Sequence, residues 1–245
     1  RNERSWARHS ALTPTPIRLD ADVIRVYAGF RDEAGVSRIG FVDVAAREPT
    51  RVLRVSAAPV LDIGSPGAFD DNGIILGDVV RHEERLFMFY VGFQHVARAK
   101  FLAFSGLAIS SDNGATFERF SAAPVMDRAD EGLYIRAVHS VCVENGTWRV
   151  WYAAGNGWET IAGKPYPQYH IRYLEARAAG PLPASGARCV DVQVPEYRIV
   201  RPRVYRFRER YMMFYTRGTT TGEYLAGYAE SSDGLHWVRK DDQLG

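Results

Sequence analysis

The sequence lacks long apolar runs and has little cysteine, and both features narrow the class of protein. No apolar run approaches the roughly 18–20 residues of a membrane span, and the first residues do not form a signal peptide. Two cysteines, Cys142 and Cys189, are too few for a disulfide framework, and Cys142 lies in an apolar run as a small core residue. We therefore expect no membrane segment and a reducing, cytoplasmic setting.

Charge and short motifs exclude further classes. The formal net charge of +2 is too small to argue for a nucleic-acid partner. There is no GxGxxG, P-loop or G-x-S-x-G motif, which removes the commonest nucleotide-binding and acyl-transfer classes. His9, His95 and His170 do not have the spacing of zinc ligands. The sequence therefore predicts neither a metal nor a cofactor.

What the sequence does contain is one apolar pattern that occurs four times. The run RLFMFYVGF at Arg85–Phe93 is typical of a buried strand. It has three relatives, at Val23–Phe30, Trp148–Gly155 and Arg210–Gly218. Each run carries one aligned tyrosine, and these are Tyr27, Tyr90, Tyr152 and Tyr215, spaced 63, 62 and 63 residues apart. A fixed period of this kind indicates a repeat architecture.

Each repeat contains four extended segments. Around Arg85–Phe93 these are Gly73–Val80, Leu102–Ser110 and Ala115–Phe120, and turns such as Asn145–Gly146 separate such segments elsewhere. Four short antiparallel strands in roughly 40–60 residues describe a propeller blade. We predict an all-β fold, a β-propeller of the five-bladed type with four blades evident, at about 10–57, 72–121, 136–192 and 198–241.

The chain 1–245 is expected to be a single propeller domain. Two alternatives are open for how the propeller ring closes. Either a fifth blade is missing from the chain, or Arg1–Asp20 helps to close a smaller ring. Ser110–Phe117 (SSDNGATF) matches an Asp-box, and Ser231–Trp237 (SSDGLHW) is a shorter relative. We interpret both as turns between third and fourth strands rather than as ligand sites, since Asp accepts backbone N–H bonds and Gly supplies positive φ.

Blade geometry places the segment before each first strand and the loop after each second strand on one face. The best-placed acids on that face are Asp71, Asp32 and Glu196, and two positioned carboxyl groups are the minimum for glycoside chemistry. The alternative is that these acids form rim salt bridges, and that His139 is a core residue. The other predicted substrate-binding residues are Arg31, Asp70, His9, Arg98, Arg136, His139, Trp158, Tyr169, Arg201, Arg217 and Glu223.

Two stretches resemble the five-bladed propeller glycosidases, which include the invertase/levansucrase, arabinanase/xylosidase and mannoside-phosphorylase families. They are FDDNGIILGDVV followed by FMFYVGF, and PEYRIVRPRVYRFRERYMMFYTRG followed by YLAGYAESSDGLHWVRKD. The resemblance covers nearly the whole chain from about residue 10. It implies acids around an axial funnel, with Asp71 matching the acid before the second blade and Glu196 an acid before a later one.

One expected acid is missing from the first blade. The glycosidases carry it in a D-P or N-D-P-N context, whereas this chain has RHSALTPTP. The departure argues against the usual hydrolysis, unless Asp32 on the adjacent loop substitutes. The phosphorylase-like branch keeps one acid and surrounds it with groups that hold phosphate. Six cations here suit an anionic group, which Arg binds with two parallel hydrogen bonds: Arg31, Arg98, Lys100, Arg136, Arg201 and Arg217.

The favoured function is therefore a carbohydrate-active enzyme of the glycoside hydrolase-like propeller type, cleaving or transferring a glycosyl unit. The substrate is expected to be an anionic, phosphorylated or nucleotide-activated sugar. Glu196 would act as general acid, and Asp71 or Asp32 as base or stabiliser. Two alternatives stay open, a propeller that binds a glycan or sugar phosphate without catalysis and a protein-interaction scaffold.

Overall fold

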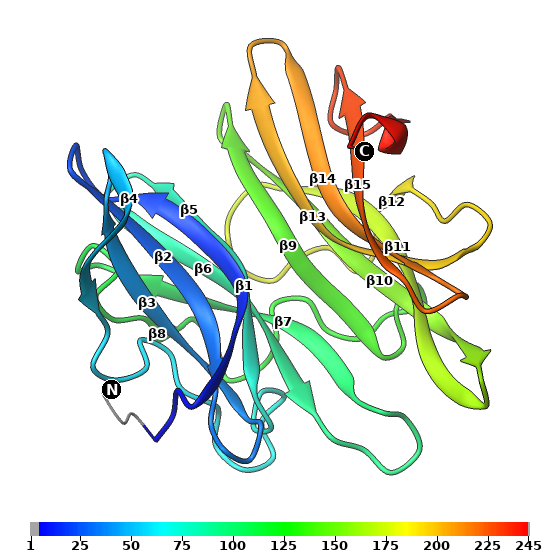
Figure 1. The fold of residues 1–245 in the computed structure, drawn as a ribbon, viewed down its shortest axis with the longest axis horizontal. Coiled ribbons are helices and arrows are strands. Elements are labelled where there is room, and N and C mark those ends of the chain that lie inside the picture. Colours follow the sequence, from blue (N-terminus) through cyan, green and yellow to red (C-terminus); the bar gives the residue numbers. More distant parts are fainter. Residues whose placement is uncertain (1–4, 245) are drawn as a thin grey trace. The chain divides into compact units, whose positions relative to one another are not determined.

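The computed structural model describes residues 5–244, whose regular secondary structure is almost entirely β-strand (Figure 1). The helical element is a short 3-10 turn, η1, at Asp241–Leu244. No helix in this part of the chain is long and apolar enough to span a bilayer. The chain forms two compact units, Arg1–Val125 and Met126–Gly245. The predicted all-β class is confirmed.

The first unit contains two runs of antiparallel strands in which each strand pairs with the next. The first run is β1 (His9–Arg18), β2 (Val23–Arg31), β3 (Ser37–Ala45) and β4 (Glu48–Val55). The second run is β5 (Ile74–His82), β6 (Arg85–Gln94), β7 (Leu102–Ser110) and β8 (Glu118–Arg119). Apolar side chains from both runs form one core cluster, which includes Tyr27, Phe41, Leu76 and Tyr90.

The second unit repeats the arrangement. Its first run is β9 (Ile135–Glu144), β10 (Thr147–Ile161), β11 (Lys164–Ala176) and β12 (Ala187–Val190). Its second run is β13 (Glu196–Phe207), β14 (Arg210–Thr219), β15 (Tyr224–Ser231) and β16 (Val238–Arg239). Trp151, Tyr173, Tyr211 and Met213 belong to the core cluster between these two runs.

The sequence repeat corresponds to the second strand of each run. The four repeated runs lie in β2, β6, β10 and β14, and their tyrosines are at most 4% exposed. The main differences are at the strand ends. The fourth strands β8 and β16 are only two residues long, because the Asp-box turns take up the preceding residues. The β10–β11 hairpin extends to Ile161, six residues beyond the predicted strand end at Gly155.

Each Asp-box turn lies between the third and fourth strands of one run and accepts a hydrogen bond from a side chain of the other run. The Asp112 carboxylate accepts hydrogen bonds from the Ser110 hydroxyl (2.6 Å) and the Thr116 backbone N–H (3.0 Å). Burial alone would raise the Asp112 pKa, but these donors outweigh it and lower the pKa to about 2. Gly114, at φ +80°, presents its carbonyl to the Tyr27 hydroxyl at 2.7 Å. These contacts are those of a structural turn, which is how we interpreted the Asp-box from the sequence.

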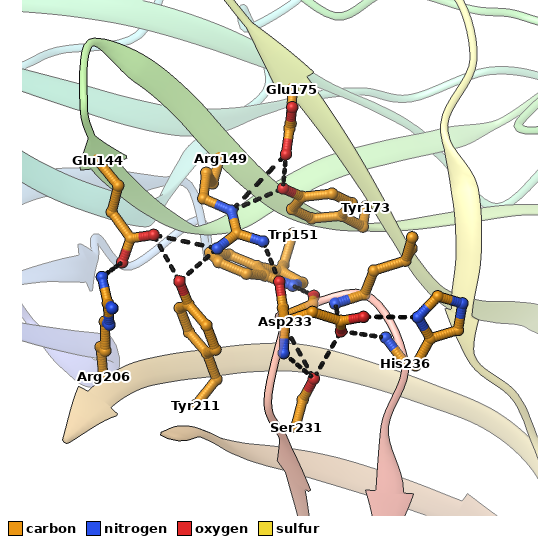
Figure 2. A network of polar contacts seen from close by, with 12 residues as sticks. Glu144, Arg149, Trp151, Tyr173, Glu175, Arg206, Tyr211, Ser231, Asp233 and His236 are labelled. Carbon is orange, nitrogen blue, oxygen red and sulfur yellow. Dashed lines mark hydrogen bonds and ion pairs between the residues drawn. The ribbon is translucent and has the colours of Figure 1, made fainter. Parts of the chain in front are cut away.

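A polar network centred on Arg149 ties the two runs of the second unit together (Figure 2). Its guanidinium donates to the Glu144 carboxylate (3.0 Å), to the Tyr173 hydroxyl (2.6 Å), to the Tyr211 hydroxyl and to the Asp233 carbonyl. Glu144 and Tyr173 belong to the β9–β12 run, whereas Tyr211 and Asp233 belong to the β13–β16 run. Burial lowers the Arg149 pKa, but these partners raise it more, so the group stays charged.

The single-domain, five-blade interpretation stays a prediction. Within the candidate closing segment Arg1–Asp20, residues 1–4 lie outside the described residues, and His9–Arg18 forms β1, the first strand of the first run.

Candidate functional site

The second unit contains a pocket of about 270 Å³ beside the β10–β11 hairpin and the start of β13. Its lining combines two tyrosine rings, three carboxyl groups and one imidazole: Glu159, Tyr169, His170, Asp191, Glu196 and Tyr197. Two of these residues, Tyr169 and Glu196, belong to the predicted site. Aromatic faces beside hydrogen-bonding groups are the usual composition of a small-molecule pocket.

An irregularity in the β10–β11 ladder shapes this pocket. Ala154 pairs with His170 and Gly157 with Gln168, so Gly155 and Asn156 drop out of register. Both of these residues line the pocket. A Cβ at Gly155 would lie 1.9 Å from the Gln168 carbonyl oxygen, so the close approach of the two strands requires glycine there.

Glu196 lies in the pocket wall but is held by two arginines. Its side chain is 3% exposed. The carboxylate accepts from Arg239 (2.5 and 2.9 Å), from Arg217 (3.2 Å) and from the Gln193 backbone N–H (2.8 Å). Burial would raise the Glu196 pKa, but these donors lower it below its ordinary value. These contacts favour the ionised form of Glu196, whereas a general acid must carry a proton, so its catalytic role stays a prediction.

Asp32 is also ion-paired, in the turn between β2 and β3. One carboxylate oxygen lies 2.7 Å from Nη1 of Arg38, and the other accepts the Val36 backbone N–H at 3.0 Å. Burial would raise the Asp32 pKa, but these contacts lower it. Arg38 also pairs with Asp62 at 2.7 Å. Asp32 thus forms a salt bridge, as the alternative interpretation of the acids expects. Its partner, Arg38, was not indicated by the sequence.

Asp71 differs from the other two acids. Its Oδ2 accepts the Gly67 backbone N–H at 2.7 Å, whereas its Oδ1 is buried and has no hydrogen-bond partner. No ion pair to Asp71 occurs within residues 5–244. The neighbouring Asp70 is 1% exposed and pairs with Arg119 at 2.8 and 2.9 Å. Asp70 is therefore ion-paired within the fold, whereas Asp71 is not, and the substrate-binding role of Asp70 stays a prediction.

Three further residues that were predicted to bind substrate make contacts within the fold. Arg136 is 2% exposed, pairs with Glu131 at 3.0 Å and donates to the carbonyls of Asp127 and Pro183. Arg136 is thus engaged within the fold, and its substrate-binding role stays a prediction. Arg217 pairs with Glu196. His139 is buried, and its pKa is lowered to about 3, first by burial and then by nearby arginines, which fits the alternative of a neutral core residue.

The other predicted ligands occupy varied surroundings. Tyr169 is buried at the pocket, and the Trp158 ring packs on Tyr134 with centroids 4.7 Å apart. Glu223 accepts the Thr221 hydroxyl at 3.0 Å in the β14–β15 turn. The remaining four are exposed, and they are His9, Arg31, Arg98 and Arg201. His9 and Arg31 pair in register at the ends of β1 and β2.

The pocket also holds residues outside the predicted set. His170 accepts a hydrogen bond from Nε of Arg172 at 3.0 Å, so its proton is on Nδ1. Burial, then the charges of Arg188 and Arg172, lower the His170 pKa to about 4, which keeps the ring neutral. Glu159 accepts from Gln168 at 2.8 Å. Glu159 and His170 adjoin the predicted Trp158 and Tyr169, and the loop argument places them on the same face, although neither is among the predicted substrate-binding residues.

No sequence pattern indicated that Asp191 lines the pocket, because this residue lies in the irregular segment between β12 and β13. It pairs with Arg188 at 2.6 Å. Burial would raise the Asp191 pKa, but Arg188 and a backbone N–H lower it. Among residues 5–244, no three His, Cys, Asp or Glu side chains are grouped to hold a metal ion.

Sequence comparison places the chain beside two mycobacterial proteins. No protein-family model matches it. It is 30% identical over 246 residues to the uncharacterized protein Rv1502 of Mycobacterium tuberculosis strain H37Rv, covering 99% of this chain and 80% of that protein. The uncharacterized protein MT1551 of strain CDC 1551 matches with the same identity and coverage. The chain belongs to the family of these two proteins.

Solved structures with the same fold are propeller glycosidases. A thermostable family-43 glycoside hydrolase matches with a TM-score of 0.67 at 15% identity, over 97% of this chain and 74% of that one. A GH32 beta-fructofuranosidase of Bombyx mori matches with a TM-score of 0.64 at 13% identity, over 94% and 48%. At these identities the likeness concerns the fold. The predicted resemblance to the propeller glycosidases is confirmed at that level.

Proposed function

We propose that the protein is a carbohydrate-active enzyme of the glycoside hydrolase-like propeller type, which cleaves or transfers a glycosyl unit. The observation that carries this proposal is the lining of the pocket in the second unit. Tyrosine rings such as Tyr169 cover the apolar face of a sugar ring. The Glu159 carboxylate and the neutral His170 ring supply an acceptor and a donor for sugar hydroxyl groups.

Asp71, which belongs to the first unit and does not line this pocket, is the proposed catalytic carboxylate. Of the three predicted acids, Asp32 and Glu196 are held by arginines, and Asp71 is not. The Oδ1 of Asp71 is a buried acceptor without a hydrogen-bond partner, which costs about 1–3 kcal/mol, and its Oδ2 accepts the Gly67 backbone N–H. A single available acid fits phosphorylase-like transfer better than hydrolysis by two carboxyl groups.

An anionic substrate is the finer part of the proposal. Two of the six cations behind it, Arg136 and Arg217, are ion-paired inside the fold. The support that remains comes from exposed residues such as Arg201 and Arg98.

A non-catalytic glycan-binding propeller is the second candidate. The observation that favours it is the ion pairing of Glu196 and Asp32, because two of the predicted catalytic acids then serve structure. Such a protein would bind a glycan saturably without turnover.

The test is turnover on a panel of oligosaccharides, nucleotide sugars and glycosyl phosphates, with and without inorganic phosphate, measured as released sugar. We expect Asp71→Asn to lower kcat by at least about 100-fold with sugar affinity retained. The matched control is Asp32→Asn, which should keep most of the activity. Saturable binding without turnover on any compound would overturn the enzymatic proposal in favour of the binding protein.

A further inference from the structure

Arg198 on β13 is a buried arginine with few partners. It is 7% exposed. Its Nη1 donates to the Tyr169 hydroxyl at 3.2 Å, and its Nε has no hydrogen-bond partner. The guanidinium lies against three tyrosine rings, at 5.6 Å from the centroid of Tyr169, 4.8 Å from Tyr197 and 4.7 Å from Tyr224. A charged fork is thus enclosed by aromatic rings.

The other strongly buried arginines of this unit all face carboxylates. Arg136 pairs with Glu131, Arg239 with Glu196, and Arg149 with Glu144. Within residues 5–244, Arg198 forms no ion pair. A buried charge costs several kcal/mol unless it is paired, and cation–π contacts return only about 0.5–2 kcal/mol each. The surroundings of Arg198 therefore lack a negative charge. An anionic ligand could supply it.

Arg198 does not itself line the pocket, but its guanidinium lies behind two residues that do. Tyr169 and Tyr197, whose rings contact its guanidinium, both line the pocket. Gly218 faces Arg198 across the β13–β14 ladder, and a Cβ there would lie 2.9 Å from the arginine Nε. Glycine at 218 thus leaves the guanidinium its space. The charge of Arg201, three residues further along β13, acts on the same tyrosine, since it opposes the rise in the Tyr169 pKa that burial causes.

We propose that Arg198 binds the anionic group of a sugar ligand in this pocket, a carboxylate or a phosphate ester, through its Nε–H and an Nη–H. Arginine holds both groups with two parallel hydrogen bonds. The protonated hydroxyl of Tyr169, which accepts from Arg198, can donate its own hydrogen to the same ligand. This inference rests on the proposed function, which supplies the sugar ligand. It adds the residue, Arg198, whose positive charge would select an anionic sugar over a neutral one.

Calorimetric titration at fixed ionic strength tests the inference with four probes: galacturonic acid, galactose, glucose 6-phosphate and inorganic phosphate. We expect the wild-type protein to bind at least one anionic sugar more tightly than galactose. Arg198→Met should weaken that binding by about 10- to 100-fold. Arg198→Lys should be intermediate, because it keeps the charge and loses the fork. Galacturonic acid and glucose 6-phosphate distinguish the carboxylate from the phosphate.

Thermal unfolding separates this role from a structural one. Arg198→Met removes a buried charge that has no carboxylate partner, so its unfolding midpoint should equal or exceed that of the wild type. The matched control, Arg136→Met, removes one of two arginines from the buried Glu131 carboxylate and should lower the midpoint. A midpoint for Arg198→Met as low as that of Arg136→Met would overturn the proposal.

The outcomes distinguish this inference from the proposed function. Equal affinity for galactose and the anionic probes, unchanged by Arg198→Met, would overturn the anion site and leave carbohydrate binding intact. Binding of inorganic phosphate that Arg198→Met abolishes, without sugar binding or turnover, would support the anion site and contradict the carbohydrate function.

Discussion

Arg239 holds the Glu196 carboxylate with two parallel hydrogen bonds, Nη1 to Oε2 at 2.9 Å and Nη2 to Oε1 at 2.5 Å. Nη2 also lies 2.6 Å from the carboxylate of Asp241, which accepts the Tyr215 hydroxyl. Glu196 opens β13 and Arg239 closes β16, so the pair joins the first and last strands of one sheet. The residue that the sequence predicts as a catalytic acid thus also stabilises the fold.

Breaking this pair should destabilise the protein. Arg239→Met leaves a buried Glu196 with one arginine instead of two, which should lower the free energy of unfolding by about 3 kcal/mol, measured by urea titration. The control is Arg210→Met, whose arginine is 74% exposed beside Glu230; it should leave the unfolding free energy unchanged. Equal stability of both variants would contradict the structural role of Arg239.

The network around Arg149 should show the same contrast within one cluster. Arg149→Met removes donors from Glu144, Tyr173 and Tyr211 together, and should cost about 3 kcal/mol of unfolding free energy. Arg206 pairs with the same Glu144, at 3.2 Å, but is 50% exposed. Arg206→Met should therefore cost about 1 kcal/mol or less. Urea unfolding of the two variants measures the difference, and a larger loss for Arg206→Met would contradict the network.

Stability should fall as the pH drops below about 6.5. Burial lowers the pKa of His139 to about 3 and that of His170 to about 4, whereas an unfolded chain protonates histidine near 6.5. Below 6.5 the unfolded state binds more protons, so unfolding becomes easier by up to about 1.4 kcal/mol per pH unit for each histidine.

The measurement is urea unfolding between pH 7 and pH 5. His139→Gln should remove the contribution of one histidine from the slope. His9→Gln, at an exposed position, should keep the full slope. An unchanged slope in His139→Gln would mean that this ring is not held neutral in the native state.

Gly155 should be intolerant of any side chain. Gly155→Ala places a Cβ 1.9 Å from the Gln168 carbonyl oxygen, so the two strands must separate, at a cost of about 1–3 kcal/mol. The pocket beside it should change shape, and sugar affinity should fall. Gly29→Ala is the control, because its nearest neighbour would be an ordinary contact at 3.5 Å. Thermal unfolding and sugar titration of both variants provide the check.

The sequence by itself determined the strands and their repetition. Apolar runs around Tyr27, Tyr90, Tyr152 and Tyr215 recur at one period, and each became the second strand of a run. Such patterns are local, because a strand's burial follows from its own residues and a turn's shape from its own Gly, Asn or Asp. Glu196 and Tyr169, which the sequence predicts as site residues, both line one pocket.

Only the tertiary structure decided which charged groups meet. Glu196 pairs with an arginine 43 residues away, and Asp70 with one 49 residues away. No local pattern specifies such pairs, because any of 31 basic residues could face any of 29 acidic ones until the strands align. The fold thus pairs Asp70 and Asp32 with arginines and leaves Asp71 without one. It also buried Arg198 among tyrosines with no carboxylate beside it, since desolvation and pairing depend on neighbours that only packing brings together.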